Sequence, residues 1–141
     1  MKTIIKILLK YSLLFTYGGF IYMTIEMLYR GFTNYYMGIC GGLSFVFIGC
    51  MNNFISWNLS ILLQSFIGGF LIITPLEYLF GIAINKDYSV WSYKDMPFNY
   101  NGQICLSFTL LWCLLSVVAI IIDDYLRYYI FDEEKPKYKI L

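Results

Sequence analysis

The chain has 141 residues, of which 60% are hydrophobic and only 13% are charged. A soluble domain of this size could not bury so much apolar surface, so the composition indicates a protein that lipid solvates. The net charge of +1 leaves no basic excess for binding nucleic acid, and the absence of histidine removes the commonest general base and metal ligand.

The first half of the chain predicts two membrane helices. Lys2, Lys6 and Lys10 precede a long apolar run that no small-x-small cleavage site follows, so we expect an uncleaved first helix over about 8–30. The second helix is expected over about 35–54, where Gly38 and Gly42 form a G-x-x-x-G pair that lets another helix approach closely. The partner of that face is either a helix of the same chain or a second copy in a homo-oligomer.

The second half predicts two further helices, over about 58–84 and 104–122. Asn58 is the expected N-cap of the third helix, and Pro75 is expected to kink it because proline lacks the backbone N–H. A polar connection over 85–103 and a charged tail over 123–141 complete the chain. The predicted fold is therefore all-α, a polytopic bundle of four transmembrane helices forming one membrane domain over 1–141.

The lysine and arginine distribution predicts the orientation. Seven of these residues fall on the side that holds both chain ends, and three fall on the opposite side. Because cytoplasmic loops carry the excess of positive charge, both termini are expected in the cytoplasm of a multi-pass cell-membrane protein.

This topology brings Glu26, Arg30 and Glu77 to a similar depth near the outer edge of the hydrocarbon. Glu26 and Arg30 are four residues apart and can pair on one helix face. Glu77 needs either a cation from elsewhere, such as Arg30, Lys86 or Lys94, or a proton on its carboxyl group. The three groups could meet water at the headgroup level, form an outward polar pocket, or act as a proton or ion relay.

The aromatic connection over 85–103 has two interpretations. Aromatic rings favour the membrane–water boundary, so the segment could lie on the outer leaflet, or it could cover a pocket at Glu26 and Glu77. The candidate binding residues are therefore Glu26, Arg30, Glu77, Trp91, Asn99, Asn101 and Gln103. No catalytic residue, metal ligand or cofactor site is predicted, and no G-x-x-x-x-G-K-[ST] phosphate loop is present.

Several short runs resemble a known family. They are Leu76–Gly81, Asn85, Trp91–Tyr93, Pro97–Asn99, Gly102–Leu106 and Leu111–Trp112, together with Glu26 in the first helix. In this combination they are similar to a small four-helix family whose bacterial members are labelled "putative ABC-transporter permease, type IV", with uncharacterised animal transmembrane relatives. The family has no established activity, so the resemblance implies no catalytic residues.

Taken together, these features favour a non-enzymatic partner subunit in the membrane of a bacterium, within a permease complex that includes a membrane protein or an ATPase. The alternative is a self-sufficient small transporter, channel or holin-like pore with an outward polar pocket around Glu26 and Glu77. A membrane enzyme is disfavoured by the lack of histidine and of a nucleophile motif.

Overall fold

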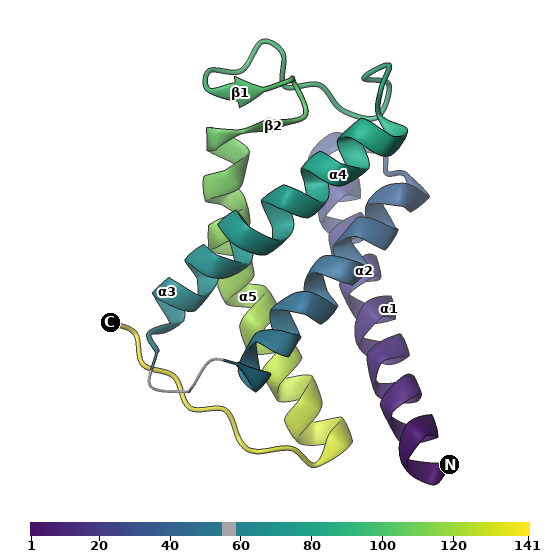
Figure 1. Cartoon of the computed structure of the whole chain (residues 1–141), viewed down its shortest axis with the longest axis vertical. Helices are drawn as coiled ribbons and strands as arrows, with labels where there is room; N and C mark the ends of the chain where they lie inside the picture. The colour runs from purple at the N-terminus through teal and green to yellow at the C-terminus, as the bar shows by residue number, and fades with distance from the viewer. Residues whose placement is uncertain (55–58) are drawn as a thin grey trace. The chain divides into compact units, whose positions relative to one another are not determined.

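The computed structural model describes residues 1–54 and 59–141, which are 71% helical, with two short strands and a loop between the last two long helices (Figure 1). Three helices are long and apolar enough to cross a membrane, namely Lys2–Arg30, Ile61–Ile84 and Leu106–Phe131, and Tyr35–Cys50 is a shorter apolar helix. The predicted all-α, four-helix fold class is confirmed. The predicted orientation stays a prediction.

Two compact units make up the chain, and each is described by itself. Unit 1 comprises Met1–Ile55 and Ala119–Lys137, and unit 2 comprises Ser56–Val118 and Tyr138–Leu141. The last helix, α5 (Leu106–Phe131), supplies its first half to unit 2 and its second half to unit 1.

Unit 1 begins with α1 (Lys2–Arg30), which starts six residues earlier than expected because nothing in its first turns breaks a helix. Gly31 ends α1 in the left-handed conformation at φ 79°, and its N–H donates to the Met27 carbonyl at 2.9 Å. The next helix, α2 (Tyr35–Cys50), is capped by Asn34, whose side chain accepts from the Tyr36 N–H at 2.9 Å. A short 3₁₀ turn, η1 (Met51–Asn53), follows α2 within the range that was expected to be its last turn.

Glycines of α2 lie directly against α1. A Cβ on Gly38 would meet the Met23 sulfur at 2.5 Å, and a Cβ on Gly42 would meet the Phe15 carbonyl oxygen at 2.7 Å. A Cβ on Gly19 of α1 would likewise meet the Gly38 carbonyl oxygen at 2.8 Å. The G-x-x-x-G face of α2 is therefore occupied by a helix of the same chain.

Unit 2 contains the continuous helix Ile61–Ile84, which is built from α3 (Ile61–Phe66), the π-helix η2 (Ile67–Ile73) and α4 (Thr74–Ile84). Ser60 caps it by accepting from the Leu63 N–H at 3.3 Å, while the expected cap, Asn58, lies outside the described residues. Just before Pro75, which has no N–H to donate, the helix widens into η2, and the Thr74 hydroxyl donates to the Gly69 carbonyl at 2.8 Å.

The connection after α4 ends in a small hairpin. Strands β1 (Asn99–Tyr100) and β2 (Ile104–Cys105) are antiparallel, with Asn99 opposite Cys105. Asn101 and Gly102 both have positive φ, at 51° and 63°, which suits an Asn-Gly hairpin turn. The hairpin takes up the two residues with which the fourth helix was expected to begin.

The predicted boundary between the fourth helix and the tail, at 122/123, is wrong. α5 continues to Phe131, and Asp123, Asp124 and Arg127 are buried within it. Opposite charges four residues apart can pair along a helix, so this charged stretch extends the helix. Further along, the Lys139 carbonyl accepts from the Ile61 N–H at 2.7 Å and so satisfies a free donor at the start of α3.

Candidate functional sites

Glu26 of unit 1 lies close to the C-terminal end of α1 and has two polar partners. Its carboxylate accepts from the Arg30 guanidinium at 2.5 Å and from the Thr33 hydroxyl at 2.7 Å. The Arg30 guanidinium also lies over the Phe32 ring, 4.6 Å from its centroid. The ion pair predicted from the four-residue spacing is therefore present.

Glu77 of unit 2 is 2% exposed. One carboxylate oxygen accepts from the Tyr93 hydroxyl at 2.7 Å, and the other accepts from the Trp112 indole N–H at 2.9 Å. Tyr93 stacks on Phe108 with ring centroids 4.7 Å apart, which holds its hydroxyl at the carboxylate. The donors at Glu77 thus include two aromatic side chains, one from the connection and one from α5, and neither was predicted as a partner of this carboxylate.

Asn85, at the end of α4, organises the connection. Its amide N–H donates to the Trp91 carbonyl at 2.7 Å and to the Gln103 side-chain oxygen at 3.0 Å. Its side-chain oxygen accepts from the Val90 N–H at 2.9 Å. The Trp91 indole in turn donates to the Gln103 carbonyl at 2.9 Å. Two predicted binding residues, Trp91 and Gln103, are therefore buried and bonded within one polar network.

Asn99 and Asn101 also make contacts within unit 2. The Asn99 amide donates to the Met96 carbonyl at 2.8 Å, and its oxygen accepts from the Gly102 N–H at 3.0 Å. The Asn101 amide donates to the Tyr78 hydroxyl at 3.2 Å. Both side chains are exposed, and these bonds shape the turns of the connection.

A further polar cluster in unit 1 was not predicted. Asp123 is 0% exposed, and its carboxylate accepts from Arg127 Nε at 2.7 Å. Glu133, which follows the end of α5, pairs with Lys10 of α1 and lies 3.8 Å from Arg127 Nη1. Tyr11 lies beside both cations, with its ring centroid 5.6 Å from Lys10 Nζ and 5.8 Å from Arg127 Cζ. We call Lys10, Asp123, Arg127 and Glu133 the charged cluster.

The charged cluster packs against a glycine of α2. A Cβ on Gly49 would come within 2.6 Å of both Asp123 Cγ and Arg127 Nη2. Asp123 Oδ1 and Arg127 Nη2 are buried and lack a hydrogen-bond partner among the described residues. The four-residue spacing of Asp123 and Arg127 was the available signal, but their position beyond the expected helix end hid it.

Within residues 1–54 and 59–141, no three histidine, cysteine, aspartate or glutamate side chains are grouped so that they could hold a metal ion. The four cysteines, Cys40, Cys50, Cys105 and Cys113, are free thiols.

Comparison with known proteins assigns the chain to a family. The model of the family described as "Putative ABC-transporter type IV" matches residues 13–139, while no curated protein and no solved structure matches the chain. The family is of a transporter type and not an enzyme family. Its model covers most of the sequence, and the three membrane-length helices imply a multi-pass protein in a lipid bilayer. The chain therefore belongs to the "Putative ABC-transporter type IV" family of membrane proteins.

Proposed function

We propose that this chain is a non-enzymatic subunit of a transport complex in the cell membrane. The observation that carries the proposal is that buried carboxylates in each unit are bonded to other side chains, while large apolar side chains are exposed. Glu26, Glu77 and Asp123 are buried and bonded to neighbouring side chains, whereas large apolar side chains of the long helices face outward, as with Leu28 at 84% exposure. Such a chain is suited to contact lipid and other membrane helices.

The family description supports a role in transport, and the sequence supports a role as one part of a larger assembly. An ABC transporter uses ATP, but this chain has no G-x-x-x-x-G-K-[ST] loop with which to hold the phosphates of a nucleotide. The ATPase would therefore be a separate chain.

The last turns of α5 are the surface that we propose for docking. Tyr129 is 74% exposed and Ile130 is 46% exposed, although Arg127 of the same helix is buried. The positive-inside rule predicts that this end of the helix faces the cytoplasm, where an ATPase would lie.

The test begins with the tagged chain, expressed in its native membrane and extracted in a mild detergent. The proposal expects an ATPase and a second membrane protein to be recovered in fixed stoichiometry, and expects Tyr129→Ser with Ile130→Ser to lose the ATPase. Leu28→Ser is the matched control, because it changes an exposed apolar residue near the C-terminal end of α1, outside the proposed docking surface on α5. Recovery of the chain alone would refute the proposal.

Substitutions are preferable to truncation after Arg127. Truncation would also remove Glu133, which pairs with Lys10, so a lost complex could reflect lost folding. The exposed side chains of Tyr129 and Ile130 can be changed without disturbing that pair.

The buried carboxylate of Glu77 favours one alternative, a self-sufficient transporter or pore. Ionisable groups inside a membrane helix commonly mark ion or substrate pathways. Under this alternative the purified chain alone, reconstituted in vesicles, would carry an ion flux that Glu77→Gln abolishes. Flux that persists in Glu77→Gln would exclude a relay through this carboxylate.

A further inference from the structure

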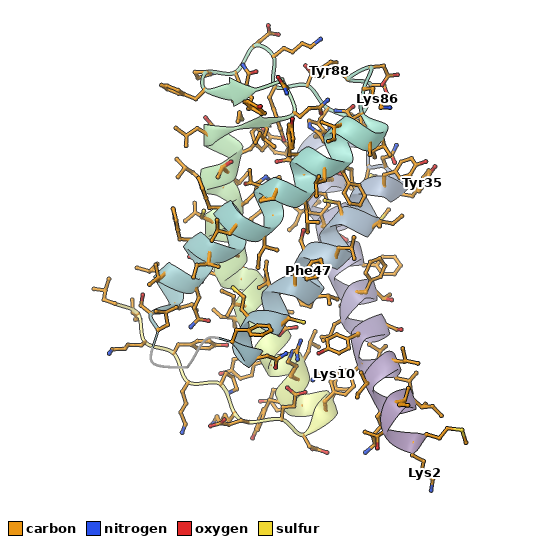
Figure 2. The ribbon with its side chains drawn as sticks, viewed as in Figure 1. Lys2, Lys10, Tyr35, Phe47, Lys86 and Tyr88 are labelled. Carbon is orange, nitrogen blue, oxygen red and sulfur yellow. The ribbon has the colours of Figure 1, made fainter. Side chains whose placement is uncertain are left out.

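The first turns of α1 form a basic helix end. Residues 1–9 are all exposed, and Lys2, Lys6 and Lys10 are each four residues apart, so they lie on one helix face. No acidic residue occurs before Glu26. Figure 2 shows Lys2 extending from the free end of α1, with Lys10 two turns further along the helix.

The length of α1 places these lysines at a membrane surface. A helix of 29 residues is about 44 Å long at a rise of about 1.5 Å per residue, whereas the hydrocarbon core is about 30 Å thick. If the Glu26 and Arg30 pair lies near one boundary, the first two turns of α1 reach the headgroups at the other boundary. The isoleucines and leucines between the lysines can then stay in contact with acyl chains while the lysine stems extend to the phosphates.

The charged cluster adds a second source of lysines to this surface. Lys10 pairs with Glu133, and this ion pair holds the segment after α5 against α1. Lys135 and Lys137 are exposed in that segment and belong to unit 1. We call four exposed lysines the basic end, namely Lys2, Lys6, Lys135 and Lys137. They outnumber the two exposed carboxylates of the same segment, Asp132 and Glu134.

We propose that the basic end of unit 1 is a binding site for the phosphate groups of anionic phospholipids, and that Glu133 is a positioning residue for it. Anionic headgroups attract basic segments at the membrane boundary, and the attraction acts within roughly 10 Å at ordinary ionic strength. The positive-inside rule assigns this surface to the cytoplasmic leaflet. The proposal is independent of the partner-subunit function, because it needs only a lipid bilayer.

The test measures binding of phosphatidylglycerol and phosphatidylcholine to the purified full-length chain in neutral detergent micelles. We expect phosphatidylglycerol to bind more tightly at low salt, and each lysine removed from the basic end to reduce that preference by about fivefold. Lys2→Gln with Lys6→Gln should therefore show a large loss. Lys86→Gln with Lys94→Gln is the matched control, because it removes two exposed lysines from unit 2. Equal loss in the control would refute a local site.

Glu133→Gln tests the positioning role. When Glu133 no longer pairs with Lys10, the segment that carries Lys135 and Lys137 should be released. Removing those two lysines should then have little further effect on the lipid preference, whereas it should have a clear effect when Glu133 is intact. Fully additive effects would refute the positioning role. Equal binding of the two lipids by the unsubstituted chain would refute the lipid site and favour an acidic protein partner.

Discussion

The buried pair of Asp123 and Arg127 permits a quantitative prediction. We expect Arg127→Met to destabilise unit 1 strongly, because it leaves the Asp123 carboxylate buried without its cation. The two side chains are 0% and 5% exposed, and a single hydrogen bond of 2.7 Å joins them. Removing one partner of such a buried pair costs about 3–5 kcal/mol.

A double variant removes both charges of this pair. Asp123→Ala combined with Arg127→Met should recover part of the lost stability, since an apolar pair no longer needs a counter-charge and the smaller side chain does not crowd Gly49. Arg30→Met provides a control within the same unit. The Arg30 side chain is 22% exposed and its partner Glu26 is 11% exposed, so water reaches this pair and the loss should be smaller.

The assay is equilibrium unfolding of the purified protein in mixed micelles of a mild detergent and dodecyl sulfate, followed by circular dichroism. A loss below about 1 kcal/mol for Arg127→Met would contradict a buried pair. A double variant as unstable as the single variant would show that the two side chains act through other contacts.

Three other variants test neighbouring features. Gly49→Ala should lose about 1–3 kcal/mol of stability although alanine is the better helix former, because its Cβ would overlap the charged cluster; a gain would contradict that packing. Asn85→Ala should cost at least about 2 kcal/mol by leaving backbone groups of the connection unpaired, and hydrogen exchange at the Trp91 amide should accelerate, whereas unchanged exchange would rule out the network. Ser89→Ala should raise the pKa of Asp87, which the Ser89 hydroxyl and then the Ser89 backbone N–H lower from its usual value. The ionised Asp87 stabilises the folded state above its unfolded-state pKa, and this stabilisation is lost as pH falls through the folded-state pKa. Carboxyl NMR titration of the variant should show a higher midpoint for Asp87, and an unchanged midpoint would contradict the assignment to Ser89.

Some contacts at the candidate sites can be predicted from the spacing of neighbouring residues, and others join residues that are distant in sequence. Glu26 and Arg30 are one helical turn apart, so their pairing follows from spacing alone. The donors at Glu77 come from Tyr93 and Trp112, which are 16 and 35 residues away in sequence. No periodicity links those positions, and only the tertiary packing of the connection and of α5 brings their polar atoms to the carboxylate.

The charged end of α5 shows a similar dependence on tertiary structure. A run with Asp123, Asp124 and Arg127 has the composition of a solvated tail, so the sequence predicted that the helix would end before it. Its burial requires Lys10 from α1, close packing on Gly49 of α2, and Glu133 from the segment that follows. Charge is excluded from an apolar interior unless it is paired, and the chain supplies part of that pairing from distant positions.

The sequence by itself determined that the protein is helical and solvated by lipid, because apolar runs of membrane length have no other stable environment. It also placed the end of α1 at about residue 30, and the structure shows that Gly31 ends this helix in a backbone conformation that other residues avoid. Tertiary structure decided which polar groups are buried and what satisfies them, because a hydrogen bond or an ion pair forms only where folding brings two distant groups within about 3 Å. Asn85, which is 0% exposed and bonded to Trp91 and Gln103, could not be distinguished in the sequence from any polar residue of a surface loop.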